Sequence, residues 1–164
     1  MLFRSGISAR AYDGSNGWIV TPLAVVPKYN LAGSERDGAR LDAMLSFPSQ
    51  IKQALTDLRV GPGTTIGDRD VTVLQGNGPN GTLATLYFDD QSGLLTRMIR
   101  HGRSPIGRVP TQVDYADYRD VGGIKFPYHW TFTWLDGKDD FQFSDVRLNA
   151  PIDAARFGEP ALPR

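Results

Sequence analysis

Cysteine is absent from the 164-residue sequence. Without a thiol, the chain excludes disulfide bonds, thiolate catalysis, cysteine-ligated zinc and any lipid or c-type haem attached within these residues. Only two histidines are present, His101 and His129. A transition-metal site would therefore need carboxylates for most of its ligands. We expect no metal and no cofactor.

The sequence also lacks an excess of charge of one sign, and it lacks long apolar runs. Eighteen basic residues balance eighteen acidic ones, so the formal net charge is zero. Nucleic-acid binding depends on clustered positive charge, and the lack of a long basic run argues against a nucleic-acid partner. No window approaches the roughly 18 apolar residues of a membrane span. Residues 1–5 are not followed by the apolar stretch of a signal peptide.

Motifs for catalysis and phosphate binding are missing as well. No nucleophile elbow accompanies the scattered serines and histidines, and neither histidine has an evident general-base partner. The glycine-rich loop at 76–81 opens no helix and contains no lysine, which a phosphate-binding loop requires. The acidic pairs at 89–90 and 139–140 lack the spacing of a calcium loop and are typical of solvated turns. We therefore predict that the protein has no catalytic residues and is not an enzyme.

Glycine and proline are plentiful, with 18 and 11 copies, and they separate short apolar runs. Regularly spaced strands with short turns predict an up-and-down antiparallel sheet. The expected strands are residues 7–12, 18–26, 59–66, 70–76, 82–88, 94–101, 109–120, 125–135 and 139–148. No linker, repeat or composition shift divides the chain, which predicts a single β-domain over residues 1–164. Because the sequence opens directly on a strand, we expect this domain to be truncated at its N-terminus.

Helical signals fall between the second and third of these strands. Ser34 can cap a helix in which Leu41 and Leu45 recur with helical spacing. A second, shorter helix is expected at 51–58. We expect the helices of residues 34–58 to pack on the concave face of a curved antiparallel meander sheet or half-open β-barrel. The predicted fold class is therefore mainly β, of the α+β type.

Two turns fix the register of the last three strands. The glycine pair at 122–123 and the Asp-Gly pair at 136–137 are both typical two-residue hairpin loops. The first turn pairs Tyr115 with Trp130, and the second pairs Trp130 with Phe143. Both turns place the same residues on one side of the sheet. That aromatic face consists of Val113, Tyr115, Trp130, Phe132, Trp134, Phe141 and Phe143.

The aromatic face has two interpretations. Most aromatic stripes in strands pack into an ordinary core. Alternatively, a curved sheet that is only partly filled by helices leaves a cavity for an apolar ligand. The two coexist where a helix fills part of such a sheet.

Charged residues follow at one end of the aromatic face. The register places Asp117, Tyr128 and Asp145 in one row and Arg119, Phe126 and Arg147 in the next. Charges on an apolar face are costly unless they are paired or lie at a wet rim. The cluster is therefore either a structural salt-bridge network or the polar mouth of a cavity, where an arginine meets an anionic headgroup. Asp145 conflicts with its apolar face, so either a bulge near residue 144 resets the alternation or the carboxylate lies inside.

Several segments carry a family resemblance. They are Ala11-Tyr12-Asp13-Gly14 with Gly17-Trp18, the hairpin from Tyr87 to Leu95, the segment from Asp117 to Pro127 and the ending from Asn149 to Phe157. Together they resemble the LolA/LolB-like family of outer-membrane lipoprotein-sorting proteins. The region that begins with Arg108 to Tyr115 is also similar to the C-terminal region of c-type cytochromes of the reaction-centre cytochrome subunit type. There, a haem-binding Cys-x-x-Cys-His segment precedes a domain of this kind.

The first resemblance implies a half-open β-barrel around an apolar cavity that takes acyl chains in the carriers, and a periplasmic or cell-envelope location. We therefore expect a non-catalytic envelope module that binds lipid, acyl chains or a lipoprotein. Its expected ligand-binding residues are Tyr115, Tyr128, Trp130, Phe132, Phe143, Arg119 and Arg147. The second resemblance implies the alternative, a structural or interaction domain attached to a c-type cytochrome in an electron-transfer chain, with the cytochrome segment in the full-length chain.

Overall fold

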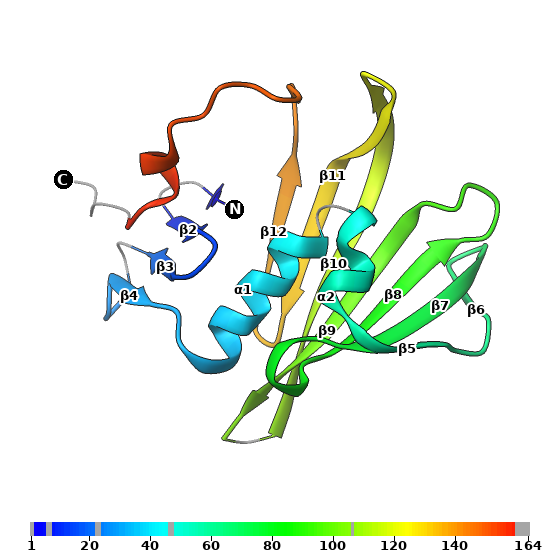
Figure 1. Cartoon of the computed structure of the whole chain (residues 1–164), viewed down its shortest axis with the longest axis horizontal. Helices are drawn as coiled ribbons and strands as arrows, with labels where there is room; N and C mark the ends of the chain where they lie inside the picture. The colour runs from blue at the N-terminus through cyan, green and yellow to red at the C-terminus, as the bar shows by residue number, and fades with distance from the viewer. Residues whose placement is uncertain (1, 6–7, 22–23, 46–47, 106, 160–164) are drawn as a thin grey trace. The chain divides into compact units, whose positions relative to one another are not determined.

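The computed structural model describes residues 2–5, 8–21, 24–45, 48–105 and 107–159. The chain divides into two compact units, one from residues 1–54 with 151–164 and the other from residues 55–150. Each unit is built on its own antiparallel sheet (Figure 1). The single domain expected from the sequence stays a prediction. Within the described residues, no helix has the length and apolar character needed to cross a bilayer.

The first unit holds a four-stranded sheet in the order β1-β2-β3-β4. Its strands are β1 (Leu2–Ser5), β2 (Ser8–Tyr12), β3 (Gly17–Val20) and β4 (Lys28–Asn30). In the predicted strands at 7–12 and 18–26, Ile7 and residues 22–23 lie outside the described residues. The second of these strands ends at Val20 instead of residue 26. The reason is a loop closed by the Thr21 N–H, which donates to the Pro27 carbonyl at 2.8 Å.

Both predicted helices occur in the first unit, and one is shorter than expected. Helix α1 (Gly33–Leu45) buries Leu41 and Leu45, as the sequence predicts. After the 3-10 turn η1 (Pro48–Gln50), α2 spans only Ile51–Ala54. The predicted continuation to residue 58 is wrong because the chain enters strand β5 at Thr56 and pairs with β7. Strand pairing thus overrides the local helical spacing. The expected packing of residues 34–58 on the concave face stays a prediction.

The second unit is an eight-stranded curved sheet, ordered β12-β11-β10-β9-β8-β7-β5 with β6 also paired to β7. Its strands are β5 (Thr56–Val60), β6 (Thr64–Ile66), β7 (Arg69–Asn77), β8 (Leu83–Asp89), β9 (Leu95–Ser104), β10 (Gly107–Val121), β11 (Ile124–Trp134) and β12 (Gly137–Gln142). From β7 to β12, neighbours in the sheet are also neighbours in the sequence, and the sheet does not close on itself (Figure 1). The predicted mainly β fold with an up-and-down sheet is confirmed.

A row of apolar side chains crosses the middle of this sheet. Met98 on β9 lies opposite Leu86 on β8 and opposite Val113 on β10. Residues directly opposite each other on antiparallel strands project to the same face. The three side chains are at most 1% exposed. They form a buried core that runs across β8, β9 and β10.

The glycine turn at 122–123 sets the register between β10 and β11. Both glycines have positive φ, 58° and 85°, as a two-residue hairpin turn requires. The resulting pairs Tyr115↔Trp130 and Val113↔Phe132 are those predicted from the sequence. This half of the predicted register is confirmed.

The predicted register between β11 and β12 is wrong, because the turn begins one residue earlier than predicted. The loop consists of Leu135 and Asp136, so Trp134 lies opposite Gly137 and Trp130 lies opposite Phe141 instead of Phe143. The reason is steric, because a Cβ on residue 137 would collide with the indole ring of Trp134. Gly137 is therefore required by its contact with the Trp134 ring and is not part of the turn. Each residue keeps its face, since its partner moves by two positions.

Candidate functional site

Five aromatic rings form an aromatic cluster on β10, β11 and the residue that follows β12. Its members are Tyr115, Phe126, Tyr128, Trp130 and Phe143. Trp130 is the centre, with ring centroids 5.2 Å from Phe143, 5.6 Å from Tyr115 and 6.0 Å from Phe126. Most of these contacts are edge-to-face, the geometry that the ring quadrupole favours. The cluster includes four of the aromatic residues predicted to bind ligand.

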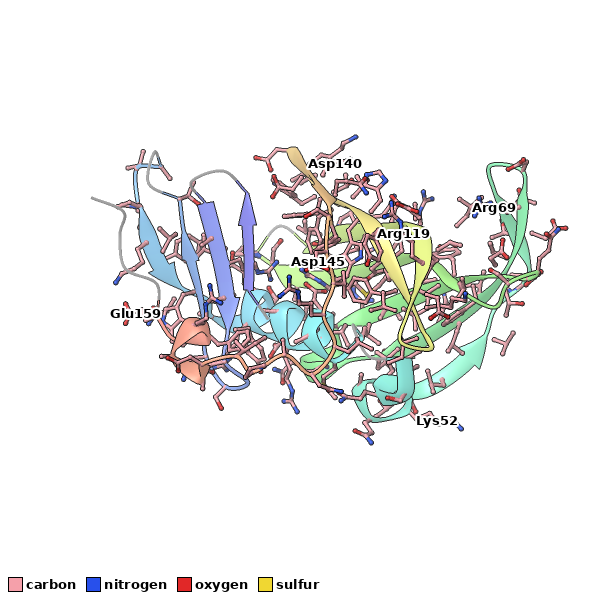
Figure 2. The ribbon with its side chains drawn as sticks, turned by 90° about the horizontal axis from the view of Figure 1, so that it is seen from above. Lys52, Arg69, Arg119, Asp140, Asp145 and Glu159 are labelled. Atoms are coloured by element: carbon pink, nitrogen blue, oxygen red, sulfur yellow. The ribbon has the colours of Figure 1, made fainter. Side chains whose placement is uncertain are left out.

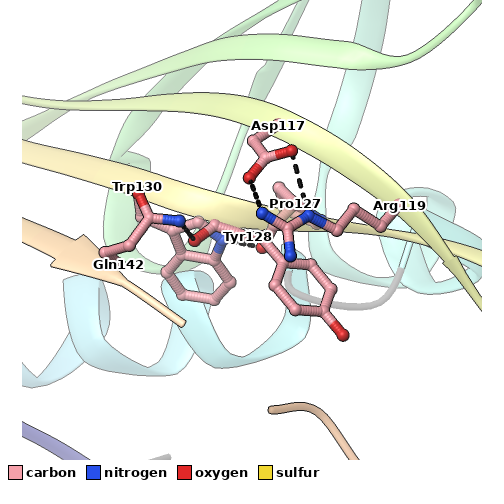
Figure 3. Close-up of polar contacts among 6 residues, drawn as sticks. All are labelled: Asp117, Arg119, Pro127, Tyr128, Trp130 and Gln142. Carbon is pink, nitrogen blue, oxygen red and sulfur yellow. Dashed lines mark hydrogen bonds and ion pairs between the residues drawn. The ribbon is translucent and has the colours of Figure 1, made fainter. Parts of the chain in front are cut away.

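Backbone carbonyls hold the cluster in place (Figure 3). The indole Nε1 of Trp130 donates to the Pro127 carbonyl at 3.0 Å. The Tyr128 carbonyl accepts from Gln142 Nε2 at 3.1 Å and from the Phe143 N–H at 2.8 Å. That last bond continues the strand pairing one residue beyond β12. It brings the Phe143 ring beside Trp130.

A stacked ion pair lies at the edge of the cluster (Figure 3). The Arg119 guanidinium donates from Nε and Nη2 to the two carboxylate oxygens of Asp117, at 3.1 and 2.5 Å. Its Cζ also lies 4.3 Å from the centroid of the Tyr128 ring. The hydrogen bond from Arg119 is the main cause that lowers the pKa of Asp117. The same hydrogen bond is the main cause that raises the pKa of Arg119. Both side chains are about half exposed, at 51% and 41%.

The backbone at Asp117 departs from regular strand geometry. Its φ is +53°, a left-handed conformation that residues other than glycine adopt rarely, with aspartate among the more tolerant. The strand pairing with β11 omits Asp117, although its two neighbours are paired, Ala116 with His129 and Tyr118 with Pro127. Such strain persists only where the surroundings impose it, and it is common at binding sites. Here paired strand residues flank it on both sides.

The second predicted charge pair is separate from the first. Arg147 Nε donates to Asp145 Oδ2 at 2.7 Å, and the side chains are 80% and 61% exposed. Neither residue belongs to a strand, because β12 ends at Gln142 and not at residue 148. The predicted rows of four interleaved charges therefore do not form by strand pairing. The conflict at Asp145 also disappears, since the chain has left the sheet before that residue.

Phe132 completes the predicted set. It is partly buried on β11, opposite Val113 on β10 and Asp139 on β12. The sequence predicted Phe141 at the position that Asp139 occupies. The structure thus brings together Tyr115, Tyr128, Trp130, Phe143 and Arg119, with Phe132 on the next row of the same face.

The polar face carries a histidine–carboxylate pair that the sequence did not predict. His129 Nε2 lies 2.7 Å from Asp140 Oδ1, so this histidine has a carboxylate neighbour where the sequence showed no evident partner. The Thr131 hydroxyl donates to Asp140 Oδ2 at 3.3 Å. The His129 hydrogen bond is the main cause that lowers the pKa of Asp140. The register error hid this pair, because it placed Asp140 opposite Thr133 instead of Thr131.

Comparison with solved structures gives the fold a precedent. A domain from Vibrio parahaemolyticus, proposed to be an outer membrane lipoprotein-sorting protein, aligns with a TM-score of 0.55 over 95% of this chain and 78% of its own, at 12% identity. This chain shares that fold. A LolA superfamily protein from Nitrosomonas europaea aligns with a TM-score of 0.47 over 85% of this chain and 67% of its own, at 14% identity. No family model and no curated protein matches the sequence.

The predicted resemblance to lipoprotein-sorting proteins is therefore confirmed at the level of the fold. The aligned region covers 95% of this chain. Neither solved structure bears on the cytochrome resemblance.

Proposed function

We propose that the protein is a non-catalytic cell-envelope module that binds an acyl chain, as a lipid or as part of a lipoprotein, on its aromatic cluster. The observation that carries the proposal is the arrangement of three rings around Trp130 at 5.2 to 6.0 Å. Ligand sites are mostly apolar and aromatic, with a few placed polar groups. The fold shared with a domain proposed to sort outer membrane lipoproteins supports this ligand class and an envelope location.

Arg119 supplies a polar group at the edge of the cluster. Asp117 takes hydrogen bonds from two of its nitrogen atoms, Nε and Nη2. A guanidinium has five N–H donors in all, which leaves the Nη1 donors for an oxygen of the ligand. Among the proposed ligand-binding residues, Arg147 is the outer cation. Phe132 extends the apolar surface of the aromatic cluster.

Titration with a fluorescent fatty acid, a dansyl-labelled undecanoic acid, tests the proposal. We expect Phe143→Ala to weaken binding of the probe about tenfold or more, because the variant removes one of the rings around Trp130. A tenfold loss of affinity corresponds to about 1.4 kcal/mol. Phe88→Ala is the matched control, because Phe88 is a partly buried strand phenylalanine on β8 outside the cluster. It should leave the affinity unchanged. A wild-type protein that does not bind the probe, or equal losses in the two variants, would contradict the proposal.

A structural or interaction domain with a filled core is the second candidate, and it includes the attachment to a cytochrome. Burial favours it, because Trp130 and Tyr128 are each only 9% exposed. The same titration separates the two functions. A filled core has no room for the fatty-acid chain and gives no saturable fluorescence change.

A further inference from the structure

A cavity of about 500 Å³ lies where β10 diverges from β9. Pairing between the two strands stops at Asp114↔Arg97. Beyond that point the carbonyl of Leu95, the first residue of β9, accepts a hydrogen bond from the Tyr118 hydroxyl at 2.7 Å. Four consecutive residues of β10, 115–118, line the cavity. Successive strand residues point to opposite faces, so this cavity lies along the edge of the strand and not on one face.

Arg69, at the start of β7, supplies the cation in the cavity wall (Figure 2). Its side chain is exposed. Arg69 is in none of the ion pairs of the described part of the chain, although its charge acts on the nearby carboxylate of Asp89. Arg119 and Arg147, the arginines predicted to meet a headgroup, each hold an aspartate two residues away. Among the described residues of the cavity wall, Arg69 is the one cation, so it is the positive charge that a ligand in the cavity would meet.

The two carboxylates of the cavity wall are already engaged. Asp89 Oδ1 accepts from the Ser92 N–H at 2.7 Å and from the Ser92 hydroxyl at 2.6 Å. These two bonds are the main causes that lower the pKa of Asp89, with a smaller contribution from the charge of Arg69. Asp117 is held through both oxygens by Arg119. The charge of Asp117 is therefore offset by a cation, whereas Asp89 keeps its charge and has Arg69 as its nearby positive charge.

Tyr115 connects this cavity to the aromatic cluster. It lines the cavity, and its ring centroid lies 5.6 Å from that of Trp130. The cavity and the cluster therefore share a residue, so one amphiphile is able to contact both. Charge-assisted hydrogen bonds from arginine to phosphate or carboxylate are among the strongest polar contacts in proteins.

We propose that this cavity binds the anionic headgroup, a phosphate or a carboxylate, of an amphiphile whose chain occupies the aromatic cluster, with Arg69 as its charged contact. The inference rests on the proposed function. The same chemistry would also accept free inorganic phosphate, and the experiment separates these two sources.

Isothermal titration of the whole chain with decyl phosphate, 1-decanol and inorganic phosphate provides the test. We expect Arg69→Gln to weaken the binding of decyl phosphate about tenfold or more, because the variant loses the charge-assisted hydrogen bond to the headgroup. Binding of 1-decanol should not change. Arg59→Gln is the matched control, since Arg59 is an exposed strand arginine on β5 that does not line the cavity. It should leave all three titrations as in the wild type.

The outcomes distinguish the two proposals. If the wild type binds 1-decanol and decyl phosphate equally and Arg69→Gln changes neither, the headgroup inference is wrong while the proposed function stands. If the wild type binds neither, both are wrong. If inorganic phosphate alone binds as tightly as decyl phosphate, the cavity is a free-anion site, and the amphiphile assignment is overturned.

Discussion

The Arg119 guanidinium lies between the Tyr128 ring, 4.3 Å from its centroid, and the carboxylate of Asp117, which accepts two of its hydrogen bonds. A planar cation that contacts a ring and a bidentate carboxylate has a fixed orientation. The remaining donors of Arg119 are therefore fixed in direction at the edge of the aromatic cluster. Lysine, a flexible point charge, would not keep this geometry.

Titration of the Asp117 carboxyl carbon by NMR measures this pair directly. The midpoint should lie below the ordinary aspartate value, because Arg119 lowers the pKa of Asp117. A lowered folded-state pKa means that the pair stabilises the fold above the unfolded-state pKa and that this contribution is lost as the pH falls through the folded-state value. Arg119→Gln should move the midpoint to higher pH. Arg147→Gln is the control and should not move it; equal shifts in both variants would contradict the assignment.

Replacement of Trp130 should destabilise the protein strongly. Trp130→Ala removes the central ring of the cluster, which is 9% exposed, and should cost about 3–5 kcal/mol. Trp130→Phe keeps a ring but leaves the Pro127 carbonyl without its indole donor, at a cost of about 1–3 kcal/mol. Urea denaturation measures both. The control Trp134→Ala removes a tryptophan that is 39% exposed and should cost much less; a similar loss in both would show that Trp130 is not a central packing residue.

Gly76 on β7 should not tolerate a side chain. A Cβ there would lie 3.0 Å from the Leu55 Cβ and 3.1 Å from the Thr56 carbonyl oxygen, which is backbone and cannot rotate away. Gly76→Ala should therefore lower the free energy of unfolding by about 1–3 kcal/mol. Gly63→Ala is the matched control, because its nearest atom, the Val71 carbonyl oxygen, would lie 4.0 Å away. The control should be neutral or slightly stabilising, and the reverse order of the two thermal midpoints would refute this explanation.

The turn between β10 and β11 should show a preference for residues that adopt positive φ. Gly123 has a φ of 85°, and Gly123→Ala should cost about 1–2 kcal/mol, the usual penalty for an L-residue in the left-handed region. Gly122→Asn should be better tolerated, because asparagine adopts this region and Asn-Gly is a favoured hairpin pair. Thermal denaturation of the two variants gives the comparison. If Gly122→Asn proves more damaging than Gly123→Ala, the turn type is misassigned.

The contrast between the two hairpins shows what local sequence determines. The Gly-Gly turn could be predicted because its backbone needs positive φ at both positions, which glycine adopts readily. The Asp-Gly pair misled the prediction because Gly137 is required by a contact with the Trp134 ring and not by the turn. A steric requirement of this kind becomes visible only when the strands are paired. The aromatic face was still assigned correctly, since a shift of two positions preserves alternation.

Other features had no local signal at all. Residues 56–58 have helical spacing, but they form the start of β5 because β7 offers a strand partner. Arg69 enters the cavity wall through the divergence of β9 from β10, which depends on long-range pairing. The His129–Asp140 pair would follow from the sequence once the register of β12 is right. Contacts between side chains on neighbouring strands can thus be predicted only when the register of those strands is predicted correctly.

The unclosed sheet of the second unit has β12 at one edge and β5 and β6 at the other. Two of these edge strands, β12 and β5, each bear a feature that discourages pairing with another copy of the chain. Lys138, Asp139 and Asp140 place charges along β12, and like strands bearing such charges repel one another when they meet. On β5, the pairing register shifts between Thr56 and Arg59, and the intervening Asp57 has a φ of +51°. An irregular edge of this kind is a poor template for another strand. Both features are of the kind by which open sheets avoid edge-to-edge pairing.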